Sequence, residues 1–312
     1  MPNVYTPEGM LLSTKENTDS LMSLAGLEKA MMQGKILESV ALLCDAAMNL
    51  TFKLGGIRGR MEKSEVAITM DGMPPKDIAV ISRVGKAVAF KVIGFEKGRN
   101  GDPVALLSRR AAQEEYIQNV FSTLVPGDIL PARVTHLEPF GAFVDIGCGV
   151  ISLLSIDCIS VSRISHPKDR FAPGQYIRTV VKSVDRNENR IFVSHKELLG
   201  TWEENAARFT PGQTVTGIVR SIEDYGIFVE LAPNLAGLAE LKDGITVGQH
   251  VAVYIKSILP ERMKIKLVLI DSFKGDSRTV MPIEYYIPES VTHMDLWQYS
   301  PDDCHKLVES VF

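Results

Sequence analysis

The sequence predicts a mainly β chain of tandem, five-stranded barrels joined by short helices. The first observation is an internal repeat: residues 127–146 realign on residues 212–231 at a constant offset of 85, and residues 174–193 realign on 248–267 at an offset of 74. The later copy is therefore 11 residues shorter between its two halves. The other two observations are strand-like alternation within each copy and helix-like periodicity between copies.

Alternating apolar and polar residues define the strands of each copy. In the run GAFVDIG the residues predicted to face inward are Ala142, Val144 and Ile146, and those predicted to face outward are Phe143 and Asp145. The later copy repeats this pattern, with Ile227, Val229 and Leu231 inward, and Phe228 and Glu230 outward. Five such strands in about 55–75 residues, without βαβ alternation, predict a small closed Greek-key barrel of the OB type.

The segments between the copies change to a helical period. Residues 195–209 place an apolar stripe on one helical face, made of Leu198, Leu199, Trp202, Ala206 and Phe209. Residues 108–124 do the same with Ile117, Val120, Phe121 and Leu124. Both segments are predicted to be connecting helices whose apolar side braces a barrel end.

A third and fainter copy precedes the other two. Residues 84–110 are similar to the half that begins at Gly174, and residues 49–65 match the strand pair that follows the aromatic motif. The expected organisation is a polar N-terminal segment with a helix at 1–33, a divergent barrel at 34–110, a helical linker at 111–126, a barrel at 127–196, a helical linker at 197–210, a shortened barrel at 211–271, and a tail of unassigned role at 272–312.

Composition narrows the class of protein. No apolar run approaches the roughly 20 residues of a membrane span and the N-terminus has no secretion signal, so we expect a cytoplasmic protein with no membrane partner. Four cysteines and six histidines show no metal-ligand or nucleophile spacing, so we expect reduced thiols, no cofactor, no metal and no enzymatic activity. The net charge is −4, but residues 34–110 hold 13 basic against 8 acidic side chains, which concentrates positive charge there.

The middle copy carries a family signature. GDILPARVTHLEPFGAFVDIG followed by PGQYIRTVVKSVDRNENRIFVSHKE resembles the S1 RNA-binding domain, the OB-type barrel repeated in bacterial ribosomal protein S1. The resemblance is close over 127–196, clear over 212–271 and weak in the first copy. It implies that RNA lies across one barrel face made of two aromatic residues, a histidine and an Asp–Arg pair.

The resemblance assigns that face position by position. In the middle barrel it assigns Phe140 and Phe143 as the aromatic residues, Asp185 and Arg190 as the pair, and Ser152 at the histidine position. In the third barrel it assigns Tyr225 and Phe228 as the aromatic residues, Glu240 at the histidine position, and Leu259 and Lys264 at the positions of the pair. The first barrel has Met48, Thr51 and Glu62 at these positions, with Arg58 and Arg60 among the basic residues that could contact phosphate instead.

The residues themselves favour the same chemistry, because single-stranded nucleic acid is held by aromatic faces under bases and by positive charge along the backbone. The loop 160–171 of the middle barrel gathers Arg163, His166, Lys168 and Arg170, and the third barrel lacks this loop. Three alternatives stay open: Phe140 and Phe143 could pack under residues 195–209, the basic loop could be only solvated, and Asp185 could form a plain turn ion pair with Arg190.

The sequence therefore predicts a single-stranded RNA-binding protein with its strongest site on the middle barrel. The resemblance implies a role in translation, holding mRNA at the small ribosomal subunit, with mRNA or ribosomal RNA as the partner. A regulatory RNA-binding protein that never joins the ribosome is one alternative. A protein-interaction scaffold with degenerate barrels is another, because the histidine positions are altered and the net charge is negative.

Overall fold

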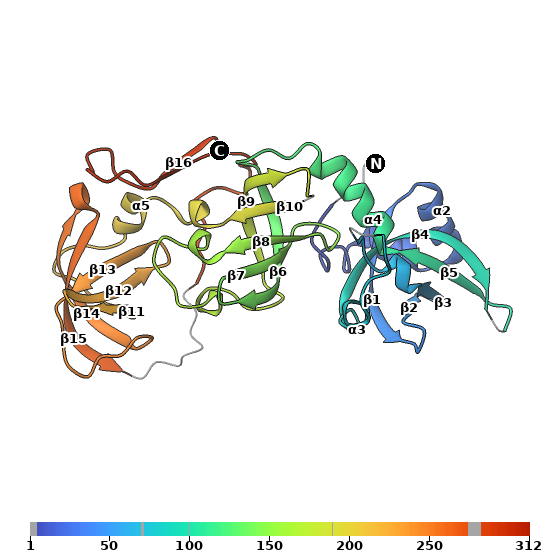
Figure 1. Ribbon diagram of the computed structural model, residues 1–312, viewed down its shortest axis with the longest axis horizontal. Helices are drawn as coiled ribbons and strands as arrows, with labels where there is room; N and C mark the ends of the chain where they lie inside the picture. Colours follow the sequence, from blue (N-terminus) through green and yellow to red (C-terminus); the bar gives the residue numbers. More distant parts are fainter. Residues whose placement is uncertain (1–4, 70–71, 99, 189, 274–281) are drawn as a thin grey trace. The chain divides into compact units, whose positions relative to one another are not determined.

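The computed structural model describes residues 5–69, 72–98, 100–188, 190–273 and 282–312. The chain divides into two compact units. One unit contains Met1–Leu124, Pro131–Arg133 and Asp145–Ile151, and the other contains Val125–Leu130, Val134–Val144 and Ser152–Phe312. Three closed five-stranded barrels confirm the predicted fold class (Figure 1).

The three barrels share one strand order, in which the first strand pairs with the second and fourth, and the third pairs with the fifth. The first barrel consists of β1 (Ile36–Cys44), β2 (Leu50–Leu54), β3 (Ile57–Met61), β4 (Ala87–Lys97) and β5 (Pro103–Ser108). The middle barrel consists of β6 (Ile129–Glu138), β7 (Gly141–Asp145), β8 (Ile151–Ser155), β9 (Tyr176–Asp185) and β10 (Arg190–Ser194). The third barrel consists of β11 (Thr214–Glu223), β12 (Gly226–Ala232), β13 (Leu235–Ala239), β14 (His250–Leu259) and β15 (Lys264–Phe273).

Each barrel encloses the inward residues that the alternation predicts. Ala142, Val144 and Ile146 are buried, as are Ile227, Val229 and Leu231. The first strand of a barrel must coil around two neighbours, and an irregularity in its register allows this, between Ala41 and Leu43 in β1 and between Val219 and Ser221 in β11. The parallel pairing of third and fifth strands closes each barrel.

The first unit has helices before its barrel, between β3 and β4, and after β5. The N-terminal segment forms α1 (Lys15–Leu21) and α2 (Leu24–Met32), each begun by a hydroxyl cap from Thr14 or Ser23. α3 (Asp77–Ile81) precedes β4, and η1 (Lys63–Glu65) follows β3. After β5 the chain forms α4 (Arg109–Tyr116), which continues as the π-helical turn η2 (Ile117–Phe121).

The prediction of one helix over 195–209 is wrong. Gly200 adopts a φ of 82°, a conformation that interrupts a right-handed helix, so η5 (Lys196–Leu199) ends there and α5 (Trp202–Ala206) begins at a capping box made by Thr201 and Glu204. The other short elements are η3 (Ile156–Cys158), η4 (Pro167–Asp169), η6 (Pro260–Arg262), β16 (Leu296–Gln298) and β17 (Glu309–Val311).

The described part of the C-terminal segment, residues 282–312, packs on both barrels of its unit. The Arg178 guanidinium on β9 donates to the backbone oxygens of Pro288 (3.0 Å) and Val291 (3.2 Å). Toward the third barrel, the Tyr299 hydroxyl donates to the carbonyl of Asn234, and the Trp202 amide donates to the carbonyl of Tyr299. The segment therefore fastens the middle and third barrels together, a role that the sequence left unassigned.

A buried histidine joins these parts. His195 is fully buried; its Nδ1 lies 2.9 Å from the carbonyl of Ile159, and its Nε2 lies 3.3 Å from the hydroxyl of Tyr285. That hydroxyl accepts from the Arg178 amide, so it can donate to His195, and the neutral Nδ1–H tautomer satisfies the whole chain of contacts. Burial accordingly lowers the pKa of His195 to about 4.

We predict that acidification weakens the unit that contains His195. Because the folded pKa lies below the ordinary value of about 6.5, the contribution is complete above that pH and is lost as pH falls toward about 4, for a total of about 3 kcal/mol. The measurement is chemical unfolding of the intact chain and of His195→Asn, which keeps a donor and an acceptor but does not titrate. The stability gap between the two proteins should narrow from about pH 7 to about pH 4.5. A gap that stays constant with pH would contradict the buried neutral histidine.

Candidate nucleic-acid interface

Two phenylalanines form an exposed aromatic cluster on the middle barrel. Phe140 lies in the turn between β6 and β7 and is 55% exposed, and Phe143 lies half-buried on β7. Their rings meet edge to face, with centroids 6.0 Å apart and planes at 89°. The exposure of Phe140 argues against its packing under residues 195–209 and leaves its ring available to a ligand.

A histidine that the sequence analysis passed over completes this cluster. His136 on β6 stacks beside Phe143, with ring centroids 6.4 Å apart and an angle of 23° between the planes. Its side chain is 63% exposed, and its Nε2 lies 2.6 Å from a carboxylate oxygen of Glu138. Thr135 and His136 are consecutive exposed residues, a break in alternation at the position where β11 carries its register irregularity. In the sequence, the available sign was that two polar residues, Thr135 and His136, follow each other within a strand that otherwise alternates.

The third barrel repeats the aromatic pair without the histidine. Tyr225 is 69% exposed and meets half-buried Phe228 edge to face at 6.0 Å. Ser221 occupies the position of His136 and pairs with Phe228 across β11 and β12. Lys264, which the resemblance placed at the arginine position, is exposed at the start of β15. The third barrel therefore offers two aromatic rings where the middle barrel offers three.

Ser152, the residue that the resemblance assigned to the histidine position, does not contribute to the exposed face. Ser152 on β8 is 2% exposed, and its hydroxyl donates to the carbonyl of Ile191 at 2.6 Å. Its place in the alternation of β8 turns it toward the barrel interior, between half-exposed neighbours. The assignment of Ser152 to RNA contact is wrong, because its side chain faces the barrel interior and its hydroxyl already donates to the Ile191 carbonyl.

The basic loop divides into exposed and buried residues. Arg163 and Lys168 are exposed. His166 is the N-cap of η4, and its Nδ1 accepts a hydrogen bond from the Lys168 amide at 3.1 Å. This nitrogen is therefore engaged in capping the helix. Arg170 has no exposed surface, and the assignment of this residue to phosphate contact is wrong.

Arg170 instead belongs to a buried ion cluster. It forms an ion pair with Glu230 on β12, and neither side chain is exposed to solvent. Arg220 on β11 also contacts Glu230, with Nε 2.5 Å from the carboxylate, and lies 3.6 Å from Asp169. Glu230 does point away from the core of its own barrel, as alternation requires, but the loop of the middle barrel covers it. The predicted outward direction of Glu230 is therefore correct, although the residue is not exposed to solvent.

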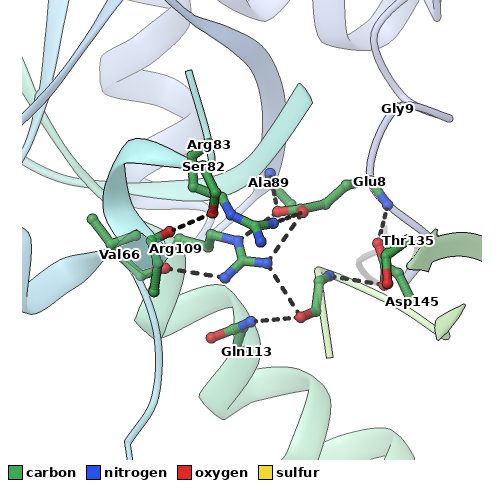
Figure 2. A network of polar contacts seen from close by, with 12 residues as sticks. Glu8, Gly9, Val66, Ser82, Arg83, Ala89, Arg109, Gln113, Thr135 and Asp145 are labelled. Atoms are coloured by element: carbon green, nitrogen blue, oxygen red, sulfur yellow. Dashed lines mark hydrogen bonds and ion pairs between the residues drawn. The ribbon is translucent and has the colours of Figure 1, made fainter. Parts of the chain in front are cut away.

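Asp145, the outward residue at the matching position of β7, is buried in the same way. Its carboxylate accepts from the amides of Glu8 (2.7 Å), Gly147 (2.9 Å) and Gly149 (3.0 Å). Figure 2 shows Glu8 extending from there to Arg109 at the start of α4, with Nε 2.6 Å from the Glu8 carboxylate. Arg109 also donates to the carbonyl of Gly149 at 3.2 Å.

The electrostatics of this network distinguish its two acids. Burial alone would raise the pKa of Glu8, but the adjacent Arg109 guanidinium outweighs burial and lowers it. Burial raises the pKa of Asp145 to about 7, and the neighbouring Glu8 carboxylate adds to this shift. Arg109 is therefore buried in a structural ion pair with Glu8. It does not contribute to the positive surface that the composition of the first barrel suggested.

The Asp–Arg pair is arranged differently from the expectation. Asp185 and Arg190 are backbone partners at the end of the β9–β10 hairpin. The Asp185 side chain accepts from the amides of Asn187 (3.0 Å) and Glu188 (3.1 Å), which stabilises the turn. Arg190 pairs with Glu188 at 2.9 Å instead of with Asp185, and its side chain is 59% exposed. Arg190 therefore remains accessible to a phosphate.

The first barrel has less free charge than its composition suggests. Arg58 is exposed on β3. Arg60 contacts two carboxylates, Glu62 at 3.0 Å and Glu96 at 3.2 Å. Acidic neighbours on the same surface thus compete with any phosphate for Arg60, and exposed ion pairs of this kind contribute little to stability.

The buried cluster generates a test that separates structure from RNA contact. Glu230→Gln strands two guanidiniums, and removing one partner of a buried pair costs roughly 3–5 kcal/mol. Arg170→Met should cost less, because Glu230 keeps Arg220. Both values come from chemical unfolding of the intact chain.

The salt dependence of RNA affinity provides the second measurement of this test. Arg170→Met should leave the slope unchanged, whereas the matched variant Arg163→Met, in the same loop but exposed, should reduce it by about 0.7. A reduced slope in Arg170→Met with unchanged stability would overturn the assignment of Arg170 to a buried cluster.

Within the described residues, none of the helices has the length and apolarity needed to cross a bilayer, and no cluster of three or more potential metal ligands is found. The positions that can contact a ligand on the middle barrel are thus aromatic and cationic: Phe140, Phe143, His136, Arg163, Lys168 and Arg190.

Comparison with known proteins assigns the family. Residues 124–196 match the family described as the S1 RNA binding domain. The chain is 31% identical over 199 residues to the small ribosomal subunit protein bS1 homolog of Bacillus subtilis, covering 62% of this chain and 50% of that protein. It is 30% identical over 258 residues to small ribosomal subunit protein bS1 of Neisseria meningitidis, covering 77% and 44%.

The chain spans about half the length of the curated relatives it matches, 50% and 44% in these two cases. A solved multidomain protein with nucleic acid binding domains from Streptococcus pneumoniae is 16% identical, covering 76% of this chain and 74% of its own, with a TM-score of 0.25. That score is too low to add to the assignment, which rests on the sequence matches and the three barrels. The chain belongs to the bacterial ribosomal protein S1-like family, and its middle barrel is an S1 RNA-binding domain.

Proposed function

We propose that this chain is a non-enzymatic, cytoplasmic protein that binds single-stranded RNA, with the middle barrel as its main site. The observation that carries the proposal is the exposed cluster of His136, Phe140 and Phe143. Three rings, from β6, the β6–β7 turn and β7, lie together on one face, and a base of any identity can stack on such a face.

Positive charge from the same barrel supports the proposal. Arg163 and Lys168 are exposed in the loop between β8 and β9, and Arg190 is exposed at the end of the β9–β10 hairpin. Phosphate contacts by such side chains release counterions, so the affinity should fall as salt rises. The combination of stacking rings and accessible cations is what a sequence-tolerant single-strand binder needs.

The other barrels are proposed to contribute less. The third barrel has Tyr225 and Phe228, but its β13–β14 connection is only residues 240–249, so it has no counterpart of the basic loop. The first barrel has Arg58 on its surface but no aromatic ring at the positions of Met48 and Thr51. We therefore infer that the middle barrel binds most tightly. The order expected from the sequence, with the first barrel above the third, relied on the positive charge of residues 34–110, and the ion pairs of Arg60 and Arg109 weaken that argument.

The biological role proposed is translation, with the chain holding mRNA at the small ribosomal subunit. The names of the bS1 relatives from Bacillus subtilis and Neisseria meningitidis support this role. A regulatory RNA-binding protein would bind RNA without joining the ribosome, and a degenerate scaffold would bind no RNA.

The stacking cluster should be essential for RNA affinity. Each stacked base is worth roughly 1–3 kcal/mol, so replacing both Phe140 and Phe143 with Ala should weaken binding by about 5- to 150-fold or more. The fold should survive, because alternation turns Phe143 away from the core residues of β7. The measurement is affinity for a single-stranded oligoribonucleotide at several salt concentrations, alongside thermal unfolding.

The matched control is the double replacement of Tyr225 and Phe228 with Ala, which removes the same pair geometry from the third barrel. We expect a smaller loss from this control and an unchanged salt slope in both variants, since the cationic side chains remain. Equal losses from the two double variants would contradict the dominance of the middle barrel, and no loss from either would contradict RNA stacking.

Ribosome association has its own test. The intact chain should co-sediment with small ribosomal subunits, and the Phe140→Ala/Phe143→Ala variant tests whether the aromatic face is required. RNA binding without co-sedimentation would replace the translational role with the regulatory one.

A further inference from the structure

The aromatic cluster continues around the middle barrel along one register level. In the third barrel, Phe228 on β12 pairs with Leu238 on β13, and Leu238 pairs with Lys266 on β15. In the middle barrel, Phe192 on β10 pairs in the same way with Leu153 on β8. Because Phe192 and Lys266 correspond at the offset of 74, this strand pairing places Leu153 at the position of Leu238, and hence beside Phe143. The same register places Ser155, and not Ser152, at the position of Glu240. We call His136, Phe143, Leu153 and Phe192 the outward row.

The alternation of each strand turns the outward row away from the barrel core. On β10, Ile191 and Val193 are buried on either side of half-buried Phe192. On β8, Ser152 and Leu154 are buried on either side of half-buried Leu153. The row therefore presents side chains from four neighbouring strands to the outside of the barrel, with a ring on three of them.

The spacing of the row provides separate positions for bases. Neighbouring strands lie about 4.8 Å apart, so Phe143 and Phe192 are separated by roughly 10 Å across β8. A ring pair interacts at centroid distances of roughly 4.5–7 Å, so the two phenylalanines offer distinct stacking positions. Leu153 lies between them and supplies an apolar floor.

A cation accompanies the second position. Arg190 precedes Phe192 by two residues on β10 and therefore points to the same side of the strand. Its side chain is 59% exposed and is held by Glu188 at 2.9 Å. A base on Phe192 would thus bring its phosphate near a guanidinium, which is the pairing of contacts that single strands require.

The other two barrels lack this second ring. The position of Phe192 is occupied by Lys266 in the third barrel, where Leu238 and Lys266 are partners. In the first barrel, Thr51 on β2 pairs with Arg60 on β3, and Arg60 pairs with Leu106 on β5, so Leu106 occupies the position of Phe192. At this register level, only the middle one of the described barrels has an aromatic ring on both its second and fifth strands; Phe273 lies at the far end of β15.

We propose that the outward row is an extended stacking platform, on which Phe192 binds a second base beyond the one held by Phe143, and His136 packs beside the first. Phe192 is then a residue that determines both the length of RNA bound and its affinity. This inference rests on the proposed RNA binding of the middle barrel.

The experiment measures affinity of the intact chain for single-stranded oligouridylates of increasing length. Phe192→Leu keeps an apolar side chain and removes the ring, and Phe192→Tyr restores a ring. Phe192→Leu should match the unsubstituted chain on the shortest oligomers and lose about 5- to 150-fold on longer ones, and Phe192→Tyr should regain that loss. Tyr254→Ala is the control, an exposed ring on β14 of the third barrel that lies outside the row, and it should change nothing.

The outcomes separate this inference from the proposed function. If Phe140→Ala/Phe143→Ala loses affinity but Phe192→Leu binds every length as tightly as the unsubstituted chain, the extended platform is wrong and RNA binding stands. If the unsubstituted chain binds no oligomer, the proposed function fails and the platform fails with it. A loss in Phe192→Leu that Phe192→Tyr does not restore would assign Phe192 to packing and would also overturn the platform.

Discussion

Closure of a five-stranded barrel fixes which side chains this chain can offer to a partner. A small barrel is filled by every second residue of each strand, and the remaining residues must face outward. Phe143 and Phe192 occupy outward positions on β7 and β10 whose strand neighbours fill the core. The same register that builds the core therefore also aligns the rings, so the candidate interface requires no structure beyond the barrel itself.

Some outward positions hold buried charged residues instead of RNA-facing ones, because another part of the chain covers them. Asp145 and Glu230 each follow the outward phenylalanine of their strand by two residues, and both are buried. Asp145 is satisfied by three backbone amides, and Glu230 by two arginines. A charge in such a place must be paired or hydrogen-bonded, because an isolated buried charge is very costly. Around Glu230, for example, Arg170 and Arg220 are held in buried ion pairs, although composition alone would make them available to RNA.

The sequence predicted the barrels and the outward direction of Phe143, because alternation and a repeat can be recognised in a single chain, and the family resemblance assigned Phe140 and Phe143 to the RNA face. It failed where a position depends on another part of the chain. Arg170 reads as a solvated loop cation until Glu230 is placed against it, and Ser152 reads as a surface residue until the pleat of β8 turns it inward. His136 was missed because a strand irregularity shifts the alternation that would have marked it as a neighbour of Phe143.

The central claim is that single-stranded RNA lies across the outward face of the middle barrel. Photocrosslinking tests it most directly, using the intact chain and an oligoribonucleotide that carries a photoreactive base, followed by identification of the crosslinked peptides. The account predicts crosslinks concentrated in the peptides that contain Phe140, Phe143 and Phe192. Crosslinks confined to the first or third barrel, with none on β7 or β10, would contradict it.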